Sequence, residues 1–284
     1  MSAAAGASPL AVAARCALAS LVAAIVIAPV VVMAVASFKS GAFEVVSDFS
    51  SWRAFWVGDP TLANYDRVIS GTVVPFLRVL FNTILIVTSI VAAGVLVNSA
   101  CAYGLARFGL PGRAIILAAI IALIILPLEA IAVPLLLLVN RMGITDTYVV
   151  QIIPFVAHPF SIFLFYQFVQ QIPRDLDEAA LMDGASPLRI WWSIILPLSA
   201  PVIATVAILQ GLEYWNSFLW PLMVTRSDDV RPLSVAVAIY FERDPKVWNE
   251  IMAFSVLASL PIVLAYLWFQ RLFIASAMSS AVKG

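Results

Sequence analysis

The sequence predicts an all-α integral membrane protein with six transmembrane helices. Apolar residues make up 63% of the 284 positions, and charged residues make up only 11%. Soluble domains contain about 45–50% apolar and about 25% charged residues, so this composition favours a bilayer as the surrounding solvent. The formal net charge is zero, which leaves no basic surface for binding nucleic acid.

Six apolar runs reach the length of about 20 residues that an α-helix needs to cross a bilayer. Arg15 is the only charged residue before the first run, and this run is longer than the apolar core of a signal peptide. We therefore expect it to be retained as a helix. No internal repeat or low-complexity linker divides the chain, which predicts one membrane domain over residues 1–284. The spans are expected at about residues 18–36, 76–103, 114–139, 148–169, 195–224 and 251–274.

The short loops favour a cytoplasmic N-terminus. The loop after the second span carries Arg107 and Arg113 and no acid, whereas the loop after the third carries Arg141 and Asp146. Short loops rich in basic residues stay in the cytoplasm. A count over all the loops places slightly more basic residues outside and by itself does not favour this orientation. With six spans, both termini are then cytoplasmic, and residues 37–75 and 225–250 form the two long extracytoplasmic segments.

A polar segment at residues 170–193 separates the fourth span from the fifth. Pro173 suits the first turn of a helix, and acidic residues follow it, where the helix dipole favours negative charge. Gly184 is placed to end this helix in a left-handed conformation. Ser186 and Pro187 suit the N-cap and the first turn of a second helix. The segment therefore predicts a pair of short helices, and the small Ala179 and the residue after it would let a partner approach closely.

This segment resembles the EAA loop in the membrane subunits of binding-protein-dependent ABC importers. Seven positions match that pattern at the expected spacing: Glu178, Ala179, Ala180, Gly184, Ile194, Leu196 and Pro197. Further similarity covers most of the chain after the first span, in ANYDRV (63–68), NTILIV (82–87), AYGLARFGLPGR (102–113), MGITDTY (142–148), WNSFLWPL (215–222) and AVKG (281–284). These motifs are similar to the carbohydrate-uptake branch, in its six-span maltose-type and glycerol-3-phosphate-type permeases. Many of those permeases have a glycine before the final AVKG, where this chain has Ser280.

The resemblance implies a type I ABC importer permease fold with a cytoplasmic coupling helix. It also implies a bacterial inner-membrane location and a sugar, oligosaccharide, polyol or glycerol-phosphate cargo. The implied partners are a second homologous permease subunit, a dimer of cytoplasmic ATPases that bind ATP and Mg, an extracytoplasmic solute-binding protein, and membrane lipid. The implied ATPase contact comprises Glu178, Ala179, Ala180, Leu181, Asp183, Gly184 and Ala185.

The chain itself is not expected to be an enzyme. It has no GxxxxGK[ST] motif with which to hold a nucleotide phosphate, so ATP hydrolysis would belong to another polypeptide. The single histidine, His158, has no nucleophile that the sequence places beside it. Cys16 and Cys101 stand in apolar surroundings and indicate neither a disulfide nor a metal site. We therefore expect no catalytic residue, metal or cofactor in this chain.

Ionisable and polar residues inside the predicted spans mark a candidate transport path, because such residues are costly in a bilayer. Each could instead bond to a neighbouring helix or to a partner permease. Prolines at positions 127, 134, 201 and 221 are expected to kink or break the third and fifth spans nearby. The candidate path residues are Glu129, His158, Gln210, Glu213, Tyr214, Asn216 and Ser217.

Two other functions remain open on the sequence alone. An autonomous secondary transporter could use Glu129, His158 and Glu213 as a proton relay, although such proteins often show two repeated halves. An ABC permease for a solute other than a sugar would keep the EAA loop but not the similarity of WNSFLWPL and AVKG to the sugar branch.

Overall fold

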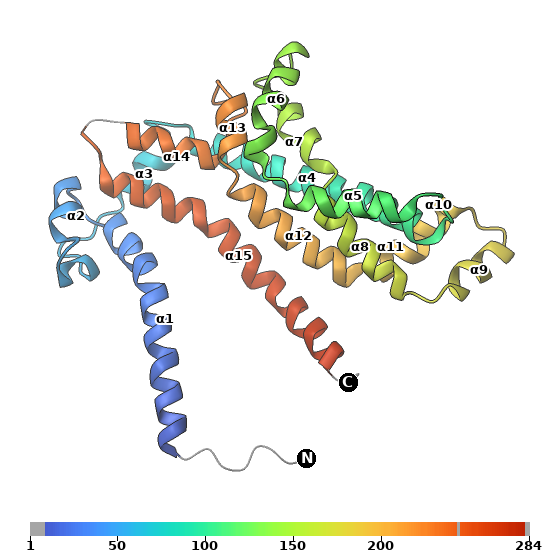
Figure 1. The fold of residues 1–284 in the computed structure, drawn as a ribbon. Helices are drawn as coiled ribbons and strands as arrows, with labels where there is room; N and C mark the ends of the chain where they lie inside the picture. The colour runs from blue at the N-terminus through green and yellow to red at the C-terminus, as the bar shows by residue number, and fades with distance from the viewer. Residues whose placement is uncertain (1–8, 243–244, 282–284) are drawn as a thin grey trace. The chain divides into compact units, whose positions relative to one another are not determined.

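The computed structural model describes residues 9–242 and 245–281, and all regular elements in these ranges are helices (Figure 1). This confirms the predicted all-α fold class. The chain divides into two compact units. Unit 1 comprises residues 1–76 and 237–259, and unit 2 comprises residues 77–236 and 260–284. The AVKG similarity at the C-terminus lies, apart from Ala281, outside the described residues.

Unit 1 combines one long apolar helix with three short helices and the start of the last helix. The long helix α1 contains Pro29 and ends at Ser37, where a loop takes the chain into the short elements. A glycine in extended conformation precedes α2, and Ser51 caps η1 by accepting a hydrogen bond from the backbone N–H of Arg53. The elements are α1 (Pro9–Ser37), α2 (Ala42–Asp48), η1 (Trp52–Phe55), α3 (Ala63–Ile69), residues 237–242 of α14 (Leu233–Glu242) and the first turns of α15 (Trp248–Ala281).

Unit 2 contains the remaining helices, arranged along the long helix α4. A buried apolar cluster holds α4 and α8 together with the segment after the polar loop, and α5 packs along α8. The elements are α4 (Phe76–Arg107), α5 (Arg113–Ile125), α6 (Leu128–Arg141), α7 (Tyr148–Val156), α8 (Pro159–Gln171), α9 (Asp175–Met182), α10 (Pro187–Ile190), the π-helical turn η2 (Trp191–Ile195), α11 (Leu196–Leu198), α12 (Ala200–Trp215), α13 (Leu219–Val224) and the start of α14 (Leu233–Glu242).

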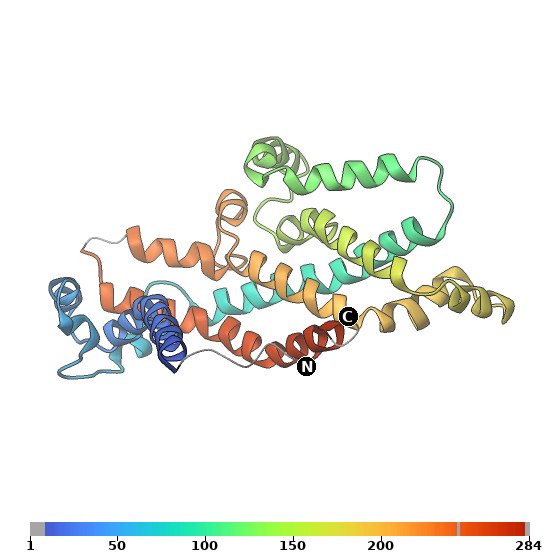
Figure 2. The same cartoon turned by 60° about the horizontal axis from the view of Figure 1, so that its bottom comes forward.

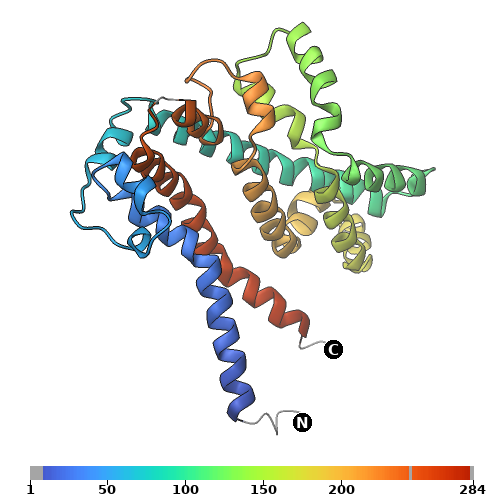
Figure 3. The same ribbon diagram turned by 60° about the vertical axis from the view of Figure 1, so that its left-hand side comes forward.

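Four helical segments of the described chain are long and apolar enough to span a membrane, and two bent helix pairs raise the number to six. The pair α5 and α6 differs from the single helix expected at residues 114–139. It bends by 98° at Leu126 and Pro127, both of which are extended, and Figures 2 and 3 show this corner. Proline lacks a backbone N–H and disfavours helical geometry in the residue before it, which explains the break.

The region expected as the fifth span, residues 195–224, is also not one helix. The segment Pro187–Leu198 bends by 76° relative to α12. The helix stops again at Trp215 before α13 begins at Leu219. The π-helical turn η2 ends two residues before Pro197. Proline has no backbone N–H to donate, and its ring clashes with the carbonyl one turn earlier, so the α-helical hydrogen bonds are interrupted here. The I-x-L-P part of the EAA pattern therefore marks a distorted helix.

Candidate functional site

A cavity of about 670 Å³ opens in unit 2 beside the broken helices α6, α8 and α12. Five of the candidate path residues line it, and they come from parts of the chain that are far apart in sequence. The rest of its wall is mostly aliphatic and aromatic. The five are Glu129 on α6, His158 at the start of α8, Glu213 and Tyr214 on α12, and Ser217 just after α12.

His158 has a defined orientation in this cavity. Its Nδ1 accepts a hydrogen bond from the backbone N–H of Ser161 at 3.3 Å, so the imidazole caps the N-terminus of α8. The neutral ring then carries its proton on Nε2. This nitrogen lies 3.5 Å from Oε2 of Glu213, whose side chain is 56% exposed. The ring therefore serves both as a helix cap and as a neighbour of the carboxylate.

The break between α7 and α8, which places His158, is held by a residue that the sequence analysis missed. Asn98 of α4 is buried, and its side-chain oxygen accepts from the His158 backbone N–H at 3.0 Å. Its Nδ2 donates to the carbonyl oxygen of Val156 at 3.1 Å. The amide thus replaces the backbone partners that are lost at the break. The sequence could have indicated Asn98 as a structural residue, because an asparagine within an apolar span needs a hydrogen-bond partner.

Gln210 and Asn216 lie away from this cavity. Gln210 is only 1% exposed, and within the described chain neither polar atom of its amide has a hydrogen-bond partner. It lies against Gly94, where an added Cβ would come within 3.1 Å of its Oε1. Asn216 is exposed and donates to the backbone oxygen of Leu212. The predicted polar stripe on α12 therefore separates into cavity-facing, buried and exposed positions.

The EAA loop forms a helix that ends in a Schellman motif. Gly184 has a φ of +81°, and its N–H donates to the carbonyl of Leu181 at 3.0 Å. The next N–H, from Ala185, donates to the carbonyl of Ala180 at 2.9 Å. Both alanines pack against the buried cluster of unit 2, which is the apolar contact that accompanies this motif. After the turn, Ser186 caps α10 by accepting from the backbone N–H of Arg189.

A buried ion pair attaches α9 to the end of α4. Arg107 Nε lies 2.7 Å from Asp177 Oδ2, with side-chain exposures of 7% and 11%. A second nitrogen of the guanidinium donates to the carbonyl of Ile172 at 2.8 Å. Burial raises the pKa of Asp177, while Arg107 and Arg174 oppose that rise. Because Arg107 contacts both the end of α8 and α9, a displacement of α9 would act directly on α4.

The outer face of the loop is apolar as well as acidic. Glu178, Ala179 and Asp183 are exposed on α9 and at its end. Large apolar side chains beside them are also exposed: Leu181 by 52%, Met182 by 89% and, at the start of α10, Leu188 by 70%. Apolar groups of this size on a polar loop are typical of a contact with another protein.

Asp146 joins two loops at the other end of unit 2. It has a φ of +59°, and its Oδ1 accepts from the backbone N–H groups of Arg226 at 2.8 Å and Ser227 at 3.0 Å. Its own N–H donates to the carbonyl of Val224 at 2.8 Å. Burial acts to raise the pKa of Asp146, but these bonds and the nearby Arg226 charge hold it below its ordinary value.

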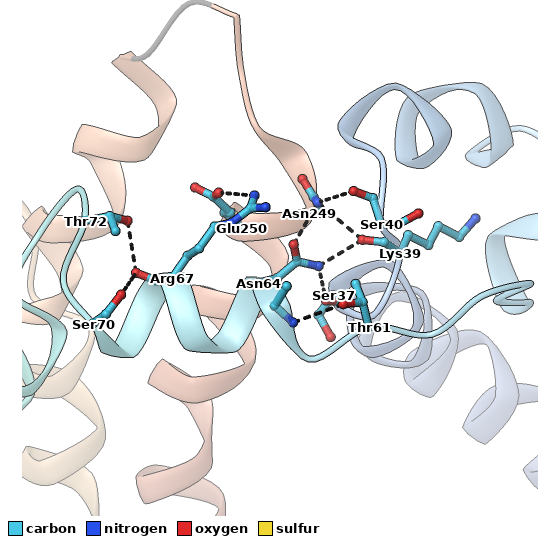
Figure 4. Close-up of polar contacts among 11 residues, drawn as sticks. Ser37, Lys39, Ser40, Thr61, Asn64, Arg67, Ser70, Thr72, Asn249 and Glu250 are labelled. Carbon is cyan, nitrogen blue, oxygen red and sulfur yellow. Dashed lines mark hydrogen bonds and ion pairs between the residues drawn. The ribbon is translucent and has the colours of Figure 1, made fainter.

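Unit 1 contains a polar cluster that the sequence analysis did not identify (Figure 4). Asn64 of α3 donates to the carbonyl oxygens of Ser37 at 2.7 Å and Lys39 at 2.9 Å. Asn249 of α15 donates to Asn64 Oδ1 at 2.8 Å, and lies within bonding distance of the carbonyls of Lys39 and Ser40. Both asparagines are buried, so the loop after α1 is held by amide groups.

Two ion pairs extend this cluster. Lys39 is 1% exposed, and its Nζ donates to Asp48 Oδ2 at 2.7 Å and to the carbonyl of Arg53 at 3.0 Å. Arg67 lies 3.1 Å from Glu250 on α15. The ANYDRV similarity therefore coincides with a segment, α3, that connects α1 to α15 within unit 1.

The family model described as "Binding-protein-dependent transport system inner membrane component" matches residues 90–277. The chain belongs to this family. The match includes the EAA loop and all the described cavity residues. It confirms the resemblance to ABC importer permeases and the assignment to the inner membrane, and it excludes the autonomous secondary transporter that the sequence alone left open.

Individual relatives agree with this membership. The chain is 35% identical over 203 residues to the "Arabinooligosaccharides transport system permease protein AraQ" of Halalkalibacterium halodurans, covering 72% of this chain and 73% of AraQ. It is 31% identical over 267 residues to the "Trehalose/maltose transport system permease protein MalG" of Thermococcus litoralis, covering 93% and 94%.

A solved structure supports the fold of this inner-membrane component. A chain from a bacterial ABC transporter involved in import of the acidic polysaccharide alginate superposes with a TM-score of 0.81. The alignment covers 94% of this chain and 98% of the other, at 22% sequence identity. This likeness confirms the predicted ABC importer permease fold.

Proposed function

We propose that this inner-membrane component is the transmembrane subunit of an ATP-driven importer for a sugar, oligosaccharide or related polyol or glycerol-phosphate compound. It forms half of the translocation path, and a second, homologous permease subunit supplies the other half. An extracytoplasmic solute-binding protein delivers the cargo. Two cytoplasmic ATPases bind ATP and Mg and perform the hydrolysis.

The observation that carries the coupling part of this proposal is the anchored α9 helix. Its Schellman motif gives it a defined end, its outer face exposes Leu181 and Met182, and Arg107 connects it to the long helix α4. A helix that is held at its base and apolar at its tip can transmit a displacement. When the ATPases close on ATP, they move α9 and α4, and the path changes between inward-open and outward-open states. The N- and C-termini are on the cytoplasmic side with α9.

The observation that favours a sugar cargo is the makeup of the cavity. It combines carboxylate, imidazole and hydroxyl groups with aromatic walls, as sugar hydroxyls and sugar C–H faces require. The names of AraQ and MalG indicate oligosaccharide and disaccharide transport for those relatives.

Site-directed cross-linking in the assembled importer tests the coupling contact. Both native cysteines are first replaced, and a cysteine is introduced by Met182→Cys on the exposed face of α9. A short thiol cross-linker is expected to join this position to the ATPase subunit, with a yield that changes when ATP is bound. Leu62→Cys, which is also highly exposed but lies in unit 1, is the matched control. Equal yields at the two positions would remove α9 from the proposed contact.

A further inference from the structure

The described wall of the unit 2 cavity carries acidic side chains and no lysine or arginine. Two carboxylates, from Glu129 and Glu213, line the cavity from separate helices. The Glu213 side chain is 56% exposed, so it faces the open space and is not covered by protein.

His158 does not cancel this negative charge by acting as a fixed cation. The Ser161 N–H occupies Nδ1, so the proton of the neutral ring lies on Nε2 and is directed towards Glu213. In this arrangement Nε2 lies 3.5 Å from one carboxylate oxygen, and the Glu213 side chain remains exposed to the cavity.

The remaining wall favours a ligand with both apolar and hydroxylated surfaces. Phe155, Tyr214 and Phe218 line the cavity together with Ser217. Aromatic faces pack against the C–H surfaces of a sugar ring, and carboxylates accept hydrogen bonds from its hydroxyl groups. An anionic ligand would meet like charges in a partly apolar site, where charge repulsion is strengthened.

We propose that this cavity selects uncharged saccharides and rejects anionic ones such as glycerol phosphates and uronic-acid oligosaccharides. Glu129 and Glu213 are the residues that set this selection. The inference rests on the proposed import function and narrows its cargo class. It also separates this chain from its fold neighbour, which serves an acidic polysaccharide.

The charge of the cavity can be measured without knowing the cargo. In the assembled importer lacking Cys16 and Cys101, a cysteine is introduced by Ser217→Cys, or by Leu126→Cys if the first variant does not assemble. Its reaction rates with trimethylammonium-ethyl and sulfonato-ethyl methanethiosulfonate are compared. We expect the ratio of the rate with the cationic reagent to the rate with the anionic reagent to be at least about tenfold higher than at the exposed Leu62→Cys control. A negatively charged cleft concentrates cations, which causes this difference.

Near-isosteric substitutions assign the effect to the two carboxylates. Adding Glu129→Gln or Glu213→Gln should lower the ratio several-fold, and both together should bring it close to the control value. A ratio at the control value in the parent, or one that the glutamines leave unchanged, overturns the proposal.

Uptake into proteoliposomes then tests selection itself. The complete importer with its own binding protein is offered an arabinotriose, trehalose and maltotriose, and separately sn-glycerol 3-phosphate and an alginate trisaccharide. If only neutral sugars accumulate, the inference is supported. If only anionic cargoes accumulate, the inference is contradicted, but the proposed import function still holds. If ATP drives none of these cargoes, the proposed function fails in this panel, and the thiol-reagent ratio still decides the charge of the cavity.

Discussion

Gly184 shows how one residue shapes the end of α9. Its φ of +81° lies in the left-handed region, whereas the space that a Cβ atom would occupy there is empty. Gly184→Ala therefore introduces backbone strain without a clash, at a cost of about 1–2 kcal/mol. We expect thermal unfolding of the purified importer to shift downward, and Gly184→Asn to cost less because asparagine tolerates this conformation.

Gly109→Ala is the matched control for this substitution. Gly109 also has open space around it, and it has no left-handed φ. Its replacement should leave the unfolding temperature nearly unchanged. Equal losses at the two glycines would mean that the left-handed turn is not the source of the effect.

Asp146 provides a pH-dependent contact between two loops. Its pKa is lowered in the folded protein, so the stability it contributes is complete above the ordinary aspartate pKa, near 4, and is lost as the pH falls through the lower folded value. Asp146→Ala should lower the unfolding temperature at pH 7 and weaken its dependence on acid pH.

Asp146→Asn separates the charge from the backbone geometry. Asparagine tolerates the φ of +59° and keeps one acceptor oxygen for the N–H groups of Arg226 and Ser227. This variant should retain more stability than Asp146→Ala at pH 7 and lose the acid dependence. An unchanged unfolding profile between about pH 3 and pH 7 in the alanine variant, compared with the parent, would contradict the assignment.

At the scale of elements, Asn98 decides where α7 ends and α8 begins. Asn98→Ala would leave the Val156 carbonyl and the His158 N–H without their present partners. A buried polar group without a partner costs about 1–3 kcal/mol, so the importer should unfold at a lower temperature. Uptake should fall further than stability alone explains, because His158 and Glu213 would lose their relative placement.

Asn140→Ala is the control for this prediction. Asn140 is exposed on α6, and a surface substitution of this kind changes stability by less than about 0.5 kcal/mol. If the two alanine variants unfolded at the same temperature and transported equally, Asn98 would not support the break between the helices.

The helix breaks also show what the sequence could and could not predict. Composition and apolar length were sufficient for the all-α class, and the Gly184 and Ser186 signals predicted the turn after α9 because both depend on local backbone chemistry. Pro127 was expected to kink or break the third span, but the 98° angle of the corner could not be predicted, because a proline does not specify the angle that tertiary packing selects. The predicted stripe from Gln210 to Ser217 assumed one regular helix, but α12 ends at Trp215.

The residues that hold the cavity together required long-range information. Asn98 and His158 are 60 positions apart, and no local pattern connects them. The same reasoning applies to Asn64 and Asn249, which meet across 185 positions. A sequence can indicate that such polar groups need partners, whereas only the folded structure identifies the partners.

At the scale of the whole molecule, the proposed transport cycle requires the exposed apolar side chains of α9 to bind another protein. Leu181→Asp together with Met182→Asp places two charges on that exposed surface without disturbing the buried Arg107–Asp177 pair. The ATPase alone should still hydrolyse ATP, but uptake by the assembled importer should fall at least tenfold, the change that corresponds to about 1.4 kcal/mol of lost contact energy. Asn140→Asp adds a charge at an exposed position on α6 and should transport normally. Full uptake by the double variant, at a normal level of assembled complex, would mean that force enters the permease elsewhere.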